Sequence, residues 1–361
     1  MTDLFSLDSY DYPLPHDRIA RYPLAQRDHS KMLVVNRATR SFAHHTFAEL
    51  PQFLAPNDVV VMNNTRVLPC RLYAKRIKAD GTCFTGAVAL LFLHPVEKTS
   101  DGLPQWRVLM KPAKKLPVGS RIQLDNHAST LTVTDYRGNG EGVVSVHLAN
   151  GVACVEDLLQ HAGEMPIPPY LNRHAEASDT TQYQTVFAKV PGSQAAPTAG
   201  LHFTPEVLAT LDEQGITRAE VTLTVSIGTF REVQTDNILN HTMDGEWYTV
   251  DNSAAQAITA CKSTNGKVLA IGTTVAKTLE TVAKEHDGTI VPQSGESKLF
   301  IVPGFEFKAV DRLLTNFHMP KSTLLMLVSA FADYDLMMAA YQEALAHNYR
   351  FYSYGDCMLI L

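Results

Sequence analysis

The sequence predicts an α/β fold in which a discontinuous α/β domain, residues 1–69 and 156–361, is interrupted by an inserted all-β, barrel-like domain at 70–155. Two observations lead to this prediction. In the carboxy-terminal part, capped helices alternate with short apolar strands, which is the pattern of an α/β sheet. In the middle of the chain the helical pattern disappears, and short β-prone runs follow one another with turns between them.

The amino-terminal segment predicts two strands, at 31–35 and 58–62. The second is nearly all apolar, as expected of a strand buried on both faces. Between them, Thr46 fits the N-cap of a helical turn over 47–50.

The inserted segment consists of short β-prone runs separated by turns that contain Gly, Pro, Asp or Asn. The runs are 87–93, 106–110, 121–124, 131–135 and 143–148. Residues 138–142 spell Gly-x-Gly-x-Gly, which occurs where many methyltransferases bind their cofactor. Such a loop needs a helix after it, so that backbone amides meet the ligand. Here a strand follows, which favours a hairpin turn and disfavours a conventional methyltransferase.

Helical patterns return after Val155. Thr204 and Pro205 open a helix as N-cap and first helical residue, and Gly215 fits its C-cap. The remaining elements are strands at 221–225 and 268–271, and helices at 275–284, 324–330 (opened by Ser322 or Thr323) and 334–346.

The bulk composition is that of a globular protein of about two domains, with 361 residues, 45% apolar and 19% charged. The five cysteines form no Cys-x-x-Cys pair, so the sequence offers no cysteine metal site and fits a reducing compartment. The first residues lack the pattern of a signal peptide, and the longest apolar runs are too short to span a bilayer. We therefore expect a soluble, cytoplasmic protein without a membrane partner.

The net charge of −6 argues against a nucleic-acid partner, but the charges are unevenly distributed. Residues 66–122 contain eleven Lys and Arg and three acids, a balance of +8, so the rest of the chain carries −14. This asymmetry suggests an anion-binding face. The alternative is a solvated basic β-surface without a partner.

A loop rich in small residues, 192–204, leads directly into the helix at Pro205. Small residues let a ligand approach the backbone, and a helix terminus offers unpaired amides. Thr198 and His202 lie in this loop, and an imidazole can act as a general base near neutral pH. The alternative is a tight loop with a packed histidine.

Three prolines follow Glu164 within the segment 163–170. They stiffen an extended segment, which can hold a carboxylate in position with little loss of entropy. The alternative is a rigid interdomain linker.

Four polar turns follow predicted strands or precede predicted helices, at 63–67, 228–230, 272–274 and 316–322. Ligands of α/β sheets bind at the carboxyl ends of strands. The four turns would form one pocket if the sheet brings these ends together; otherwise each is an ordinary turn.

These segments, in this order, resemble the S-adenosylmethionine:tRNA ribosyltransferase-isomerase family of queuosine biosynthesis. The resemblance runs from Tyr12-Pro13-Leu14-Pro15 to Leu361. Its most specific pieces are 163–170, 195–204, 315–331 and 349–356. The resemblance implies an α/β domain with an inserted β-barrel, in agreement with the pattern above.

The resemblance also implies a reaction. The ribosyl part of S-adenosylmethionine is transferred to a 7-aminomethyl-7-deazaguanine base at the tRNA wobble position and rearranged to an epoxy-cyclopentane, giving epoxyqueuosine, while adenine and methionine leave. S-adenosylmethionine is then a co-substrate, with no permanently bound cofactor and no metal expected. A ribose proton beside the sulfonium is acidified, and His202 and Glu164 are our candidates for the base that removes it.

Two sets of side chains are expected to bind the substrates. The substrate-binding candidates are Asn63, Asn64, Thr65, Arg66, Thr198, Gly200, Phe203, Thr229, Thr273, Asn316 and His318. The tRNA-binding candidates are Arg71, Lys75, Arg76, Lys111, Lys114 and Lys115.

The sequence departs from the family pattern between 224 and 298. Thr224 and Ser226 stand where the family usually has His and Gly, and Lys277 stands for an arginine whose bidentate fork it cannot reproduce. Asp244 replaces a histidine, and residues 295–298 read Gly-Glu-Ser-Lys instead of Gly-Trp-Thr-Asp. An alternative function is therefore a tRNA-binding relative with lost or altered catalysis. The identity of the base, the preferred tRNA and the oligomeric state are left open.

Overall fold

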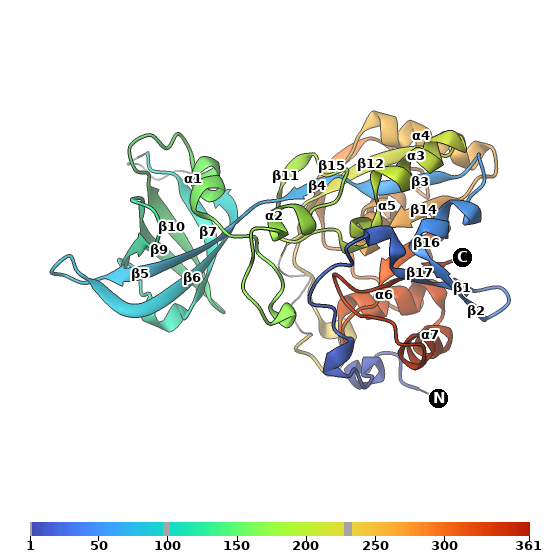
Figure 1. Ribbon diagram of the computed structural model, residues 1–361, viewed down its shortest axis with the longest axis horizontal. Coiled ribbons are helices and arrows are strands. Elements are labelled where there is room, and N and C mark those ends of the chain that lie inside the picture. The colour runs from blue at the N-terminus through green and yellow to red at the C-terminus, as the bar shows by residue number, and fades with distance from the viewer. Residues whose placement is uncertain (1, 97–101, 227–232) are drawn as a thin grey trace. The chain divides into compact units, whose positions relative to one another are not determined.

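The computed structural model describes residues 2–96, 102–226 and 233–361 (Figure 1). The chain divides into two units, an α/β unit of Met1–Arg66, Pro168–Arg173 and Gln182–Leu361, and a barrel unit of Val67–Ile167 and His174–Thr181. An α/β fold interrupted by a β-barrel is thus confirmed. Helix α1 (Val155–Ala162) falls within the barrel unit. The domain boundaries expected from the sequence, 69/70 and 155/156, stay predictions about where independently folding domains begin and end.

The α/β unit is built on a nine-stranded mixed sheet in the order β15-β13-β12-β3-β14-β16-β17-β1-β2. Strand β3 lies between β12 and β14, parallel to both, and β14 is parallel to β16. The strands are β1 (Lys31–Asn36), β2 (Ser41–Thr46), β3 (Val59–Asn63), β12 (Thr217–Leu223), β13 (Glu246–Val250), β14 (Val268–Ile271), β15 (Gln293–Ser297), β16 (Arg312–Asn316) and β17 (Cys357–Ile360). A separate two-stranded sheet pairs β4 (Thr65–Val67) with β11 (Val190–Ser193).

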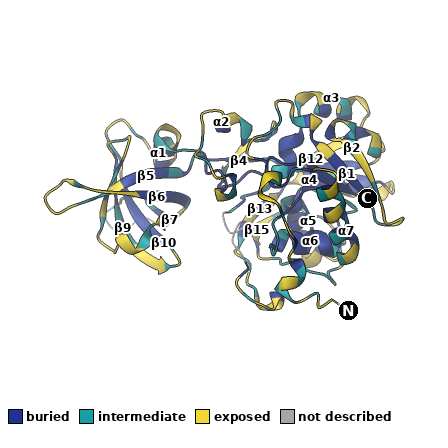
Figure 2. Cartoon of the chain, turned by 60° about the horizontal axis from the view of Figure 1, so that its bottom comes forward, coloured by how far each residue is buried: buried dark blue, intermediate teal, exposed yellow. Residues whose placement is uncertain are grey.

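Both faces of this sheet are covered, and the central strands are buried (Figure 2). Side chains alternate between faces along a strand. Val59 and Val61 accordingly pack in the larger core with helices α4 to α7, whereas Val60 and Met62 pack in a second core with helix α3 and Phe47. This two-sided burial explains why the strand at 58–62 reads as an uninterrupted apolar run.

The helices begin at the caps that the sequence indicates. The Thr204 and Ser322 side chains accept hydrogen bonds from Val207 N (3.3 Å) and Leu325 N (3.2 Å). The helices are α2 (Asp179–Gln182), α3 (Pro205–Glu213), α4 (Asn252–Ser263), α5 (Thr273–Glu285), α6 (Thr323–Ala332) and α7 (Tyr334–Ala346). The 3-10 turns are η1 (Leu7–Tyr10), η2 (His16–Arg18), η3 (Arg27–His29), η4 (Phe47–Phe53), η6 (Pro169–Leu171), η7 (Thr198–His202) and η9 (Ile238–Asn240).

The barrel unit contains a closed antiparallel barrel in the order β10-β7-β6-β5-β8-β9. Alternate side chains fill its interior, as Leu72 and Ala74 of β5 and Val108 and Met110 of β7 illustrate. The turn at 138–140 joins β9 to β10 as a hairpin, as predicted. The elements are β5 (Arg71–Ile77), β6 (Cys83–Val96), β7 (Gln105–Lys111), η5 (Ala113–Lys115), β8 (Arg121–Leu124), β9 (Thr130–Gly138) and β10 (Glu141–His147).

Within the described residues, no single helix is long and apolar enough to cross a membrane. Helices α6 and α7 reach that length and composition only as a pair, and they are bent by 113° at the break between them.

Candidate functional site

The α/β unit contains a pocket of about 650 Å³. Most of its wall comes from four segments that are far apart in the sequence: 196–199, Gly272–Thr274, Thr315–Met319 and Tyr352–Ser353. Gly272 follows β14 and Asn316 ends β16, and because these neighbouring strands are parallel, their carboxyl ends meet at one edge of the sheet. The pocket therefore occupies the usual ligand position of an open α/β sheet.

An aromatic pair forms part of the pocket wall. The rings of Tyr170 and Tyr352 lie 4.7 Å apart between centroids, and the Tyr170 hydroxyl is hydrogen-bonded to Ser353. Tyr352 has a φ of 71°, an unusual conformation for a bulky residue. Such strained backbone is often found at ligand sites, where the surrounding structure holds it in place.

Asn316 is the central polar residue of the pocket. Its Nδ2 donates to the backbone oxygen of Tyr352 (3.1 Å) and to Nε2 of His202 (3.2 Å). Its Oδ1 is buried and has no hydrogen-bond partner among the described residues. A buried acceptor without a partner costs about 1–3 kcal/mol, so a ligand that donates a hydrogen bond here would recover this energy.

His202 lies in η7, buried behind Asn316 and against the ring of Phe47. Burial, together with the positive charges of Arg350 and Arg27, lowers the pKa of His202 to about 3. The imidazole is therefore neutral at physiological pH. Because Nε2 accepts a hydrogen bond from Asn316, the ring proton resides on Nδ1.

His318 lines the pocket directly. Its Nε2 is hydrogen-bonded to Thr315 Oγ1 (2.9 Å), its backbone N–H donates to the Tyr341 hydroxyl (2.8 Å), and its carbonyl accepts from the Tyr12 hydroxyl. Burial lowers the pKa of His318 to about 3. This histidine is thus a neutral, rigidly held group of the pocket wall.

The other expected substrate-binding residues lie in different surroundings. Thr198 and Thr273 line the pocket with Asn316 and His318. Gly200 and Phe203 are packed in the core, since a Cβ at Gly200 would lie 2.7 Å from the Phe187 ring, and Phe203 contacts the rings of Phe47 and Phe187. Thr229 and the turn 228–230 lie outside the described residues.

The polar turn after β3 does not line the pocket. The Asn63 amide bonds the backbone of Leu223 through both of its polar atoms (each 3.0 Å), and Thr65 Oγ1 bonds Ser193 Oγ (2.6 Å). Asn64 bonds Glu220 and Thr222, and Arg66 is exposed. The pocket thus unites two of the four turns considered, 272–274 and 316–322.

Glu164, the second candidate base, belongs to the barrel unit. Its backbone exchanges two hydrogen bonds with that of Arg71, at 2.8 and 3.1 Å, and its side chain is half-buried. The preceding residue must be glycine, because a Cβ at Gly163 would lie 1.7 Å from the carbonyl oxygen of Pro69.

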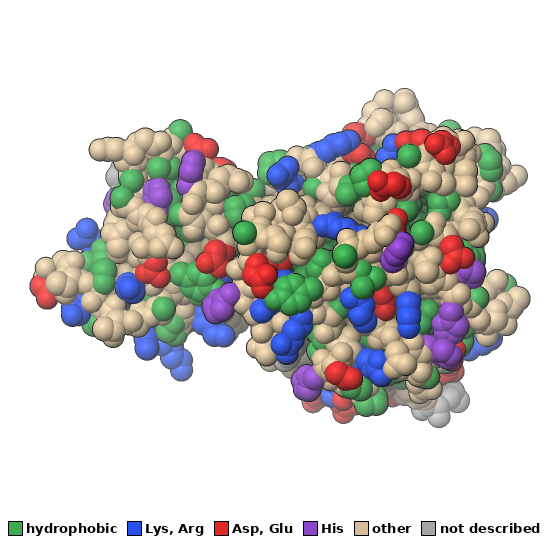
Figure 3. All heavy atoms as spheres, in the orientation of Figure 1, with side chains coloured by type: hydrophobic (Ala, Val, Ile, Leu, Met, Phe, Trp, Pro, Cys, Tyr) green, Lys and Arg blue, Asp and Glu red, His purple; other side chains and the backbone are tan. Residues whose placement is uncertain are grey.

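The tRNA-binding candidates all lie on the barrel unit, where Lys and Arg side chains are visible along the lower edge in Figure 3. Lys75, Lys111, Lys114 and Lys115 are exposed, and Arg71 and Arg76 are half-buried. Lys75 lies 3.9 Å from Asp125, and Arg76 donates to the carbonyl of Lys115 and lies over the Phe84 ring.

Sequence reasoning missed several pocket residues, namely Tyr170, Thr315, Tyr352 and Ser353. Tyr170 and the pair Tyr352–Ser353 lie in two of the most specific motifs, 163–170 and 349–356. These family motifs could have pointed to the residues, although a motif match assigns no role to a particular side chain.

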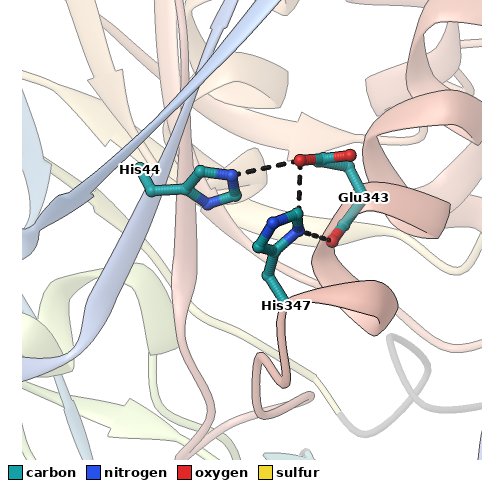
Figure 4. Close-up of side chains that lie close together, drawn as sticks. All are labelled: His44, Glu343 and His347. Atoms are coloured by element: carbon teal, nitrogen blue, oxygen red, sulfur yellow. Dashed lines mark hydrogen bonds and ion pairs between the residues drawn. The ribbon is translucent and has the colours of Figure 1, made fainter.

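Three side chains outside the pocket could hold a metal ion: His44 of β2 and Glu343 and His347 of α7 (Figure 4). One Glu343 oxygen lies 3.1 Å from His44 Nε2 and 3.1 Å from His347 Nδ1. The Tyr349 hydroxyl bonds the other nitrogen of His44 (2.9 Å), and the Glu343 carbonyl oxygen lies 3.0 Å from His347 Nδ1. These hydrogen bonds account for the cluster, and none of its residues lines the pocket at the strand ends.

A family model described as "Queuosine biosynthesis protein" matches residues 7–360. A relative from Thermosynechococcus vestitus, named S-adenosylmethionine:tRNA ribosyltransferase-isomerase, is 46% identical over 359 residues, which are 99% of this chain and 97% of the relative. A protein of the same name from Natranaerobius thermophilus is 44% identical, over 98% of this chain and 99% of its own length.

Among solved structures, the chain is similar to an S-adenosylmethionine tRNA ribosyltransferase from Thermotoga maritima. The TM-score is 0.53 at 31% sequence identity, and the match covers 98% of this chain and 100% of the other.

Proposed function

The chain belongs to the queuosine biosynthesis protein family, and we propose that it is an S-adenosylmethionine:tRNA ribosyltransferase-isomerase, a transferase. It transfers the ribosyl part of S-adenosylmethionine to 7-aminomethyl-7-deazaguanine at the tRNA wobble position. Isomerisation gives epoxyqueuosine, and adenine and methionine are released. S-adenosylmethionine is consumed as a co-substrate, so no permanently bound cofactor is needed. Such an enzyme works on tRNA in the cytoplasm.

The observation that carries this proposal is the pocket at the ends of β14 and β16. Its aromatic pair, Tyr170 and Tyr352, suits a purine, which interacts favourably with aromatic rings. Oδ1 of Asn316, which has no partner in the described part of the chain, suits the amino group of adenine or a ribose hydroxyl. Thr198 and Thr273 add hydroxyls to the wall. We therefore place the adenosyl part of the co-substrate in this pocket.

The rearrangement requires a base, because it begins with loss of a proton from the ribose carbon beside the sulfonium. His202 and Glu164 remain our candidates. His202 is present as the neutral imidazole and is connected to the pocket through Asn316. Glu164 lies in the barrel unit, and its candidacy rests on its place in the motif 163–170. Nε2 of His202 can accept the proton once it gives up the hydrogen bond that it accepts from Nδ2 of Asn316.

The barrel provides the basic residues for tRNA. Arg71, Lys75, Arg76, Lys111, Lys114 and Lys115 are assigned phosphate contacts, which position the nucleic acid without reading its sequence. The wobble base must leave the stack to react, so its recognition belongs to the pocket.

The decisive experiment measures adenine released from S-adenosylmethionine by the full chain. The substrate is tRNA that carries 7-aminomethyl-7-deazaguanine at the wobble position, and the matched control is the same tRNA with guanine there. We expect release only with the modified tRNA. No release with either tRNA would overturn the proposal.

A second function, tRNA binding without catalysis, is favoured by the departures between 224 and 298. One of them is Lys277, which stands where the family has an arginine. Lys277 is buried and forms an ion pair with Glu246, so its charge is already engaged within the protein. In the same assay this function gives tRNA binding without adenine release.

A further inference from the structure

A second pocket, of about 420 Å³, adjoins the first. The two share Thr273 and Thr274, at the start of α5, and Leu324 of α6 as wall residues. The rest of the second pocket is mostly apolar, with Met243, Leu299 and Leu327 among its lining residues.

A single ion pair interrupts this apolar wall. Nζ of Lys277, in α5, lies 2.9 Å from Oε2 of Glu246, in β13, and each side chain is only 7% exposed. Burying such a pair costs several kcal/mol in desolvation and rarely stabilises a fold by itself. The pair therefore calls for an explanation other than stability.

Lys277 has unused hydrogen-bonding capacity. An ammonium group carries three donors, and among the described residues Glu246 is the one acceptor that Nζ contacts. Thr273 and Thr274, the first two residues of α5, line both pockets, and the first amides of a helix have no partner within the helix. A helix N-terminus and a lysine with spare donors both favour a negative group at this place.

We propose that the second pocket binds the α-amino acid group of a zwitterionic ligand. The ligand carboxylate binds Lys277, the ligand ammonium lies beside the Glu246 carboxylate, and the aliphatic chain packs on Met243, Leu299 and Leu327. A zwitterion has no net charge, so its entry adds no net charge to the pocket. An inorganic phosphate would instead bring unbalanced negative charge beside Glu246.

This inference rests on the proposed function for the identity of the ligand, which is the methionyl part of S-adenosylmethionine. With adenosine in the first pocket and the amino acid in the second, the sulfonium lies near their shared wall at Thr273, Thr274 and Leu324. The structure thereby assigns one part of the co-substrate to each pocket. After the reaction, methionine leaves from the second.

The test compares the binding of two ligands to the full chain: S-adenosylmethionine and 5′-methylthioadenosine, which lacks the amino acid group. The variants are Lys277→Met and the double variant Lys277→Met/Glu246→Gln, which removes both charges of the pair. We expect both variants to weaken S-adenosylmethionine at least about tenfold, the loss of one charge-assisted hydrogen bond, and to leave methylthioadenosine unchanged. Thr198→Ala, in the first pocket, should weaken both ligands.

Equal effects of Lys277→Met on the two ligands, or none on either, would overturn the inference. Should the variants fail to fold, the affinities of the wild-type chain for the two ligands still test the inference. A methionyl subsite requires S-adenosylmethionine to bind more tightly than methylthioadenosine. Failure of the proposed function gives a different result: the wild type then binds neither adenosyl ligand. In that case binding of L-methionine but not of L-methioninol, which lacks the carboxylate, still supports the amino acid site, and binding of neither overturns it.

Discussion

At the scale of single residues, His202 and Glu164 are the side chains on which our assignment of the base depends. We expect His202→Ala and Glu164→Ala each to reduce the rate of adenine release at least about tenfold, roughly 1.4 kcal/mol of barrier. The measurement is single-turnover adenine release by each variant, with thermal unfolding as the check that the fold is intact. If both variants fold and turn over like the wild type, neither residue is the base.

The two buried histidines of the site also predict how stability depends on pH. The pKa values of His202 and His318 are lowered to about 3, whereas the same groups in the unfolded chain have a pKa of about 6.5. Below pH 6.5 the unfolded chain therefore binds protons that the folded chain does not, and the free energy of unfolding falls as the pH falls toward 3. Their stabilising effect is complete above pH 6.5.

The measurement for this prediction is urea unfolding at pH 7 and pH 5. His318→Gln removes one of the two titrating groups while keeping a polar side chain, so its stability should fall less between these pH values than that of the wild type. An equal fall in both proteins would show that His318 titrates normally in the folded chain.

The residues of the pocket were only partly predictable from the sequence. Thr273, Asn316 and His318 were expected from polar turns and Thr198 from the loop rich in small residues, and all four line the pocket. Whether they bind substrate stays a prediction. Asn63 has the same chemistry and a similar position after a strand, but its amide is consumed by the backbone of Leu223. A polar residue type does not reveal whether its partner is a ligand or a neighbouring strand.

At the scale of elements, helix caps were the most reliable local signal, because a cap depends on residues only a few positions apart. Ser322 opens α6 and accepts a hydrogen bond from Leu325 N. We expect Ser322→Ala to lower the free energy of unfolding by about 1 kcal/mol. Chemical denaturation measures this loss. The matched control is Ser263→Ala, at the last residue of α4, which should change stability by less than about 0.5 kcal/mol. Equal losses would mean that the Ser322 cap does not stabilise α6.

Strands that pair with distant segments were harder to predict. Strand β17, Cys357–Ile360, lies between β16 and β1 and is fully buried, yet it is a four-residue apolar run with no periodicity to identify it. Its partner β1 begins more than three hundred residues earlier in the chain. Tertiary packing decides which strands pair across such a separation, and the local sequence pattern of a strand does not show its partner.

At the scale of the whole molecule, the change in pattern near residue 70 predicted the inserted barrel correctly, because the loss of helical periodicity extends over a long stretch. The distribution of charge follows the same division: the segment 66–122, with its balance of +8, lies almost entirely in the barrel unit, while the chain as a whole carries −6. A protein can therefore be acidic overall and still present a basic surface to an anion.

This charge distribution gives the last prediction, that lysines of the barrel supply phosphate contacts to tRNA. Replacing all three of Lys111, Lys114 and Lys115 by glutamine should weaken tRNA binding and flatten its dependence on salt. A variant that contacts fewer phosphates releases fewer counterions from the tRNA when it binds. Binding of S-adenosylmethionine should stay nearly unchanged, since all three lysines lie in the barrel unit and the pocket lies in the other. The measurement is tRNA affinity at several salt concentrations.

The matched control replaces Lys284, Lys298 and Lys308, three exposed lysines of the α/β unit, with glutamine, which changes the net charge by the same amount. If charge alone mattered, the two triple variants would lose affinity equally; if the barrel contacts phosphate, the first loses much more and shows the smaller salt slope. An unchanged affinity and slope in the barrel variant would mean that its lysines only keep the barrel surface solvated, the alternative that the sequence left open.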